Sequence, residues 1–187
     1  MGKIVITGTG RCGTSFLVHL FTALEFNTGY TLEECIWHLK RSKCDGGIEH
    51  SIGTELFKKS DIVKNPLWMY DPEVLDFDID YLIVPFRKLE NVALSRERNN
   101  GYGGFLKGAN DINSQMDMDA KAFYKFMEYI IKKDLKVIFL DFPRIVEDIN
   151  YLHEKLFDLL GKYGHVSKWS MFSKVFHEIA DIKKVHI

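Results

Sequence analysis

The stretch that decides the fold is residues 3–17, KIVITGTGRCGTSFL. It begins with KIVIT, a β-branched run with little alternation of apolar and polar side chains, which is typical of a strand buried on both faces. Glycines then punctuate residues 8–13, and apolar side chains recur at helical spacing over residues 14–25. The sequence therefore predicts a strand, a glycine-rich loop and a helix over residues 3–25.

The loop after this strand, residues 8–13, is called the glycine loop below. It keeps the G-x-x-x-x-G frame of a phosphate-binding loop, but Thr14 stands where a nucleotide triphosphatase has lysine. Glycines let main-chain N–H groups converge on an anion, and the next helix adds its N-terminal N–H groups and positive dipole end. The hydroxyls of Thr14 and Ser15 can donate hydrogen bonds, and Arg11 supplies positive charge. We therefore predict a phosphate-type anion site here.

Two other interpretations of the glycine loop stay open. It can be a tight structural turn between a strand and a helix, or a dinucleotide fingerprint, since Gly8, Gly10 and Gly13 satisfy G-x-G-x-x-G. A dinucleotide site needs an acidic residue at the end of the second strand, where this chain has Lys64. The sequence therefore favours the anion site.

The rest of the chain alternates between strand and helix patterns. Three more apolar runs, 61–64, 81–86 and 136–140, are typical of buried strands, and helical patterns cover 89–98, 120–133, 145–160 and 167–182. Residues 30–59 are expected to form helices and loops over the sheet, 69–80 turns, and the glycine-containing 99–118 a mobile loop. This order predicts a three-layer α/β/α fold with a central parallel sheet and a ligand beyond the carboxyl ends of its strands.

The composition is that of one soluble globular domain over residues 1–187. The net charge of −1 excludes attraction of the whole surface to nucleic acid or to an acidic membrane. No apolar run reaches the ~18–20 residues that span a bilayer, and no signal peptide precedes the first strand, so we expect a cytoplasmic protein. Cys12, Cys35 and Cys44 lack metal-ligand spacing and are expected to be free thiols in a reducing compartment.

A second anion site is predicted where the third strand ends. Arg87 lies at the carboxyl end of that strand, and Ser95 follows in the next predicted helix. An arginine fork and a hydroxyl can bind one phosphate from two directions. Two anion sites at neighbouring strand ends indicate a ligand that is phosphorylated at two separate positions.

Together these motifs resemble the PAPS-dependent sulfotransferases, which have a P-loop-like fold. The stretch TGTGRCGTSFL is similar to their 5′-phosphosulfate loop, and VPFRKLENVALSR is similar to their 3′-phosphate motif. VKNP at the second strand end resembles the Lys-x-Pro of the glycan-modifying branch, and DFPRIVEDINYLHEKL resembles a late segment of many bacterial members. Without a membrane anchor, a bacterial or viral cytosolic member is expected rather than a resident Golgi enzyme.

The resemblance implies transfer of a sulfuryl group from PAPS to an acceptor hydroxyl or amine of a small molecule or glycan, with adenosine 3′,5′-bisphosphate released and no metal required. It implies that Arg87 and Ser95 bind the 3′-phosphate. It also implies which residues hold the 5′-phosphosulfate: Arg11, Cys12, Gly13, Thr14 and Ser15. Two departures stand out: Arg11 replaces the lysine of many members, and Lys64-Asn65-Pro66 replaces a Lys-Thr-His, so that histidine base is absent.

In-line sulfuryl transfer requires that the protein position the acceptor and neutralise charge on the transferring and leaving oxygens. Arg11 and Lys64 are the predicted cations for that task. For the general base we expect Glu49 first and His50 second, with His38 and Glu55 as rivals. Four aromatic residues could form a platform for a sugar, although packing in the core or in a lid is the commoner role of such residues: Trp37, Trp68, Tyr70 and Tyr102.

Two other functions compete with sulfuryl transfer. A nucleotide kinase or NTPase with an altered phosphate loop would need an acidic Mg²⁺ ligand at a strand end, for which Asp141 is the candidate. A catalytically degenerate nucleotide-binding module would keep the loop and lose the chemistry. The missing loop lysine argues against the first alternative, and the small size of the chain and the unidentified base leave the second open.

Overall fold

The sheet at the centre of the protein has four strands. The computed structural model describes residues 2–41, 47–99, 104–163 and 169–180. In this part of the chain the strands are β1 (Lys3–Ile6), β2 (Ile62–Lys64), β3 (Ile79–Phe86) and β4 (Val137–Asp141). They lie in the order β2-β1-β3-β4, and all three pairings are parallel. The predicted parallel sheet is confirmed, with each strand within two residues of its predicted start.

Side chains that alternate along the strands enter two different cores. Ile4 and Ile6 of β1 pack into one core, whereas Val5 between them packs into the other. Ile83 of β3 shares the core of Ile4, and Leu82 shares that of Val5. Because consecutive strand residues face opposite sides, both faces of the sheet must be covered, which explains the apolar runs.

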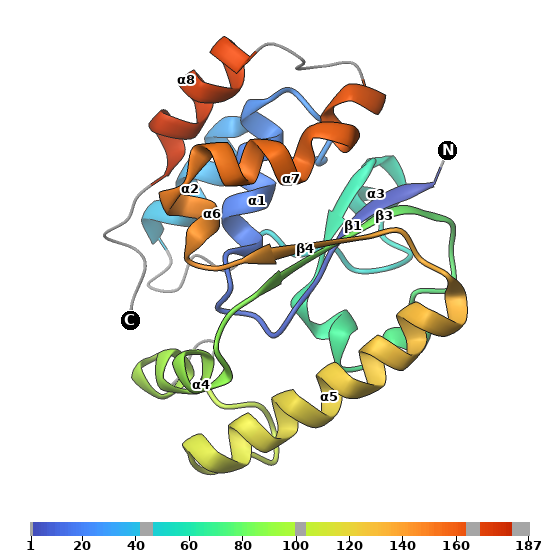
Figure 1. Cartoon of the computed structure of the whole chain (residues 1–187), viewed down its shortest axis with the longest axis vertical. Helices are drawn as coiled ribbons and strands as arrows, with labels where there is room; N and C mark the ends of the chain where they lie inside the picture. Colours follow the sequence, from blue (N-terminus) through green and yellow to red (C-terminus); the bar gives the residue numbers. More distant parts are fainter. Residues whose placement is uncertain (1, 42–46, 100–103, 164–168, 181–187) are drawn as a thin grey trace.

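Helices form the two outer layers (Figure 1). On one side of the sheet lie α1 (Thr14–Ala23), α2 (Leu32–Arg41), α6 (Arg144–Glu147), α7 (Ile149–Lys162) and α8 (Trp169–Ile179), and on the other lie α4 (Leu89–Arg98) and α5 (Ile112–Lys133). The remaining elements are α3 (Glu55–Lys59) and the 3₁₀ turns η1 (Pro66–Met69) and η2 (Pro72–Val74). In the described part of the chain, no helix combines the length and apolar character needed to cross a bilayer.

The predicted loop over 99–118 is wrong in its second half, because α5 already begins at Ile112. Asp111 caps this helix: its side chain accepts from the Ser114 amide, and the Ser114 hydroxyl accepts from the Asp111 amide. This capping box stabilises a first turn whose polar residues look like loop. The predicted helix 145–160 is two helices, because Asp148 ends α6 and caps α7.

Candidate functional site

The glycine loop lies between β1 and α1, at the carboxyl end of the sheet. Gly10, Arg11 and Gly13 have φ angles of 71°, 56° and 84°, in the left-handed region. A Cβ on Gly13 would lie 2.8 Å from the Phe142 ring, so both backbone conformation and space require glycine there. Among the described residues, the main-chain N–H groups of Gly13, Thr14 and Ser15 donate to no acceptor. They are free to bind an anion.

A buried ammonium lies at the start of α1. Lys64 ends β2, next to β1, and its side chain is 1% exposed. Its Nζ atom donates to Ser15 Oγ at 3.2 Å and to Glu49 Oε1 at 2.6 Å. A charge this deeply buried needs partners. Lys64, Ser15 and Glu49, called the Lys64 cluster below, therefore join a cation, a hydroxyl and a carboxylate at the predicted anion site.

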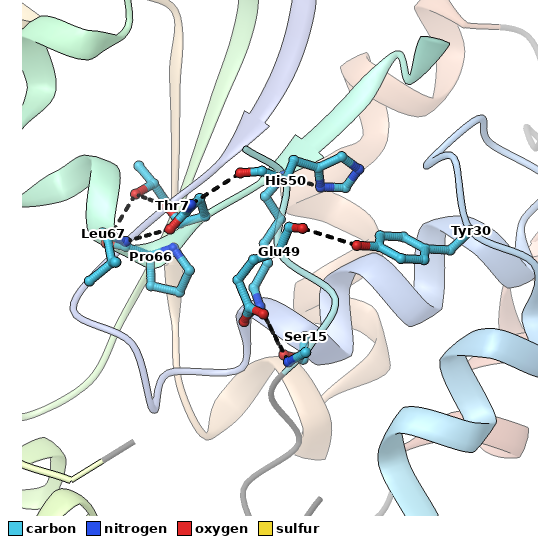
Figure 2. Close-up of polar contacts among 10 residues, drawn as sticks. Thr7, Ser15, Tyr30, Glu49, His50, Pro66 and Leu67 are labelled. Atoms are coloured by element: carbon cyan, nitrogen blue, oxygen red, sulfur yellow. Dashed lines mark hydrogen bonds and ion pairs between the residues drawn. The ribbon is translucent and has the colours of Figure 1, made fainter. Parts of the chain in front are cut away.

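Glu49 is held from several directions (Figure 2). Its Oε2 atom accepts from the Gly47 amide at 2.8 Å, and its main-chain carbonyl accepts from the Tyr30 hydroxyl at 3.0 Å. Its side chain stays 37% exposed. Burial alone would raise the pKa of Glu49, but the Lys64 ammonium outweighs that effect and lowers it. Glu49 is therefore an ionised, oriented carboxylate that solvent can reach.

His50 is fully buried, and main-chain groups occupy both ring nitrogens. The Lys64 amide donates to Nδ1 at 3.0 Å, and Nε2 lies 2.9 Å from the Thr28 carbonyl. The ring is thus the neutral tautomer with hydrogen on Nε2. Burial lowers the pKa of His50, so the ring stays neutral. The geometry fixes His50 as a structural bridge between β2 and Thr28 and favours Glu49 as the base.

The two rival bases have different surroundings. Glu55 lies at the start of α3 with its side chain 88% exposed, in an ion pair with Lys58. His38 lies in α2 against Trp37, with ring centroids 4.8 Å apart. Neither side chain has a hydrogen bond to the Lys64 cluster among the described residues. Glu49 is the carboxylate that the fold brings to the loop.

The predicted 3′-phosphate residues also meet the glycine loop. Arg87 directly follows β3, and its Nη1 donates to the Arg11 carbonyl at 3.1 Å. Arg11 Nε in turn donates to Ser95 Oγ at 3.1 Å. Burial, and then the positive charge of Arg11, lower the pKa of Arg87. Two guanidinium groups that repel one another are stabilised by an anion between them. The two predicted anion sites are therefore neighbours joined through Arg11.

Cys12 lies inside the glycine loop with no exposed surface. Burial raises the pKa of its thiol to about 11, so the sulfur is neutral at physiological pH. Cys12 and Cys35 are both free and buried, whereas Cys44 lies outside the described residues. Cys12 can contribute its main-chain N–H to an anion and does not supply a thiolate.

The four aromatic residues considered for a sugar platform do not lie together on the surface of the described part of the chain. Trp68 is 5% exposed and packs in the core with Phe57. Tyr70 is turned inward, and its hydroxyl contacts the Thr9 carbonyl at 3.0 Å. Trp37 alone of the four is shown on the surface, at 51% exposure, and Tyr102 lies outside the described residues.

The structure also gives contacts for two residues to which the sequence assigned no role in the site, Asn65 and Arg96. Asn65 donates from Nδ2 to the His50 carbonyl at 3.1 Å, and its Oδ1 accepts from the Leu67 amide at 3.0 Å. His50 and Leu67 are labelled in Figure 2. Arg96, next to Ser95 in α4, donates to the Thr9 carbonyl at 2.7 Å. Its signal is weak in the sequence, because a helical arginine is usually a surface residue.

Acidic residues do not gather at the glycine loop. Within the described ranges, no group of three His, Cys, Asp or Glu side chains is arranged to hold a metal ion. Asp141, the candidate Mg²⁺ ligand, ends β4, and β3 separates that strand from β1. The neighbouring Phe142 does reach Gly13 of the glycine loop, whereas the hydrogen bonds of the described residues include none from the Asp141 side chain to that loop.

Comparison with known proteins identifies the fold. No protein-family model and no curated protein matches the chain. It is similar to a sulfotransferase domain from the Synechococcus PCC 7002 olefin synthase, with a TM-score of 0.52 and 15% identity over 97% of this chain and 81% of that one. A sulfotransferase domain from the curacin biosynthetic pathway gives a TM-score of 0.52 and 16% identity over 91% of this chain and 76% of that one. The chain has the α/β fold of these sulfotransferase domains.

Proposed function

We propose that the protein is a PAPS-dependent sulfotransferase that acts on a hydroxyl or amine of a small molecule or glycan. The observation that carries this proposal is the Lys64 cluster. A fully buried ammonium bonds both to a hydroxyl at the N-terminus of α1 and to a reachable carboxylate. Sulfuryl transfer needs this combination, because charge on the moving group must be neutralised while a base takes the acceptor proton.

The residues around the glycine loop divide into two anion sites. The main-chain N–H groups of Cys12, Gly13, Thr14 and Ser15, together with the Ser15 hydroxyl, bind the 5′-phosphosulfate at the helix N-terminus. Arg87 and Ser95 bind the 3′-phosphate. Arg11 lies between the two sites, since it bonds to Ser95 and its carbonyl accepts from Arg87. This arrangement suits a nucleotide with phosphates at two positions.

PAPS supplies the sulfuryl group on a phosphate leaving group. Ionised Glu49 accepts the proton of the acceptor while the acceptor oxygen or nitrogen forms its bond to sulfur and the bond from sulfur to the bridging oxygen breaks. Lys64 and Arg11 together stabilise the negative charge on the transferring group and on the leaving oxygen. Since Lys64 already holds Glu49, the base and the cation are positioned together.

Ligand-dependent thermal stability tests the proposal. Adenosine 3′,5′-bisphosphate at ~100 times its dissociation constant adds about 2.7 kcal/mol, which raises the melting temperature by roughly 5–10 °C. ADP and ATP, with or without Mg²⁺, should shift it less because they lack the 3′-phosphate. A shift with ATP and Mg²⁺ but none with the bisphosphate would refute the proposal. Arg87→Ala sharpens the test, since it should weaken bisphosphate binding about 10–100-fold and 5′-AMP binding little.

A further inference from the structure

A main-chain carbonyl in the glycine loop is held from outside by two side chains. The Thr9 carbonyl oxygen accepts from Arg96 Nη2 at 2.7 Å and lies 3.0 Å from the Tyr70 hydroxyl. Arg96 belongs to α4 and Tyr70 follows η1, so two separate elements converge on one peptide group. Neither side chain belongs to the predicted anion sites.

Behind these two residues lies a buried polar network, called the Arg96 cluster: Arg96, Tyr70, Asp119 and Gln115. The Tyr70 hydroxyl lies 2.6 Å from Asp119 Oδ1, which also accepts from Gln115 Nε2 at 2.9 Å. Asp119 and Gln115 are fully buried in α5, and Arg96 is 6% exposed. The network therefore ties α5 to the loop through Tyr70.

The contribution of the Arg96 cluster to the stability of the fold does not by itself explain its residues. Arg96 Nε and Asp119 Oδ2 are buried and have no hydrogen-bond partner among the residues that the structure describes. Unpartnered buried polar atoms are unfavourable, and well-packed apolar residues in such places are often neutral or stabilising. What the cluster provides is orientation, since Arg96 also donates from Nη1 to the Gly104 carbonyl, in the segment between α4 and α5.

The orientation of the Thr9 carbonyl determines the direction of the next amide. In a planar trans peptide the C=O and the following N–H point in opposite directions. With the Thr9 carbonyl turned toward Arg96 and Tyr70, the Gly10 N–H points away from them. A Cβ on Gly10 would lie 3.1 Å from Arg96 Nη2, so the backbone packs directly on the guanidinium. Arg87 holds the Arg11 carbonyl and thereby orients the Cys12 N–H in the same manner.

We propose that Arg96 and Tyr70 are positioning residues for the anion site, which hold the Thr9–Gly10 peptide and thereby fix the course of the glycine loop around the bound phosphate. This inference rests on the proposed anion-binding role of the glycine loop and is independent of which nucleotide binds. The Tyr70 hydroxyl has one hydrogen and two acceptors within reach, Thr9 O and Asp119 Oδ1. Burial raises the pKa of Asp119, and a protonated carboxyl would leave that hydrogen for Thr9.

A matched pair of tyrosine variants tests the inference. Tyr70→Phe removes a hydroxyl that contacts the loop, whereas Tyr129→Phe removes a hydroxyl from α5 that donates to the Leu75 carbonyl at 2.7 Å. We expect Tyr70→Phe to weaken bisphosphate binding about 5-fold, as for one lost hydrogen bond, and Tyr129→Phe to leave it unchanged. Arg96→Lys keeps the charge but loses the planar fork and should weaken binding about 10-fold or more.

The second readout is the ¹H–¹⁵N resonance of Gly10 in the ligand-free protein. We expect it to move in Tyr70→Phe and in Arg96→Lys and to stay in place in Tyr129→Phe. Equal losses of bisphosphate affinity in Tyr70→Phe and Tyr129→Phe, or an unmoved Gly10 resonance in the first two variants, would overturn the inference. If the wild type binds no bisphosphate, the proposed function fails, and titration of the Gly10 resonance with inorganic pyrophosphate decides the inference instead.

Discussion

The Lys64 cluster and the Arg96 cluster both contain a buried cation and a carboxylate beside the glycine loop, but Lys64 bonds to Glu49 directly, whereas Arg96 and Asp119 are linked only through Tyr70. Glu49 is 37% exposed, and both of its oxygens accept hydrogen bonds. Asp119 is fully buried, and its Oδ2 has no partner among the described residues. Lys64 lowers the pKa of Glu49, whereas burial raises that of Asp119. An ionised carboxylate that solvent can reach is suited to act as a general base, whereas a fully buried one is suited to orient the groups around it.

The largest expected effect comes from exchanging each carboxylate for its amide. Glu49→Gln should lower sulfuryl transfer about 10²–10⁴-fold, since an amide cannot accept the acceptor proton, and should keep bisphosphate affinity. Asp119→Asn should keep most of the turnover, because the amide oxygen can still accept from Gln115. The measurement is transfer of labelled sulfate from PAPS to a panel of sugar and phenol acceptors. Equal activity of the two variants would remove the distinction between the clusters.

A smaller effect is expected from the cation of the Lys64 cluster. Lys64→Met should lower turnover about 10²–10³-fold, as for loss of a group that stabilises developing charge. Its bisphosphate affinity should fall much less, because the bisphosphate lacks the sulfuryl group. Turnover and calorimetric binding on the same variant separate the two quantities. If Lys64→Met loses binding and turnover equally, Lys64 binds the nucleotide and does not act on the transferring group.

The smallest effect concerns stability and pH. Because its folded pKa is lowered, ionised Glu49 stabilises the fold above its unfolded pKa, and this contribution is lost as pH falls through the folded pKa. Glu49→Gln should therefore lose on the order of 1 kcal/mol at neutral pH, as for a partly screened ion pair, and less at pH 3. Urea unfolding at the two pH values measures the difference.

For Asp119 the pH dependence of the free energy of unfolding has the opposite sign. Its folded pKa is raised, so its contribution to stability is present below the unfolded pKa and is lost as pH rises through the folded pKa. The free energy of unfolding of Asp119→Asn, relative to that of the wild type, should therefore increase as the pH rises from 3 to neutral. A parallel pH dependence in Glu49→Gln and Asp119→Asn would show that the two carboxylates do not differ as described.

Much of the fold could be predicted from local patterns. The β-branched run before Gly8 and the periodic apolar residues after Thr14 define the first strand, loop and helix, and Lys64 and Arg87 were placed at strand ends for the same reason. The start of α5 could not be predicted, because its first turns are polar and follow a glycine-rich stretch. Its capping box between Asp111 and Ser114 was the available signal.

The site was less predictable than the fold, since its contacts join distant parts of the chain. Arg96 meets Thr9 from 87 residues away, and no spacing rule connects them. Gln115 lies within the predicted loop 99–118 and Asp119 directly follows it, so neither was expected in a buried network. A sequence also cannot show that main-chain groups occupy both nitrogens of His50, which is what distinguishes it from its neighbour Glu49.

The all-parallel sheet has a consequence for how the protein folds. Ile4 pairs with Ile62, Ile6 with Ile83, and Phe86 with Asp141, so every pairing closes a long loop and no hairpin can nucleate the sheet. Such non-local pairing makes folding slow, because the entropy of closing each loop is lost before the contacts form. The glycine loop acquires its shape only when β1, β2 and β3 have all joined. If the glycine loop binds the proposed nucleotide, a fragment that ends before β3 should not bind it.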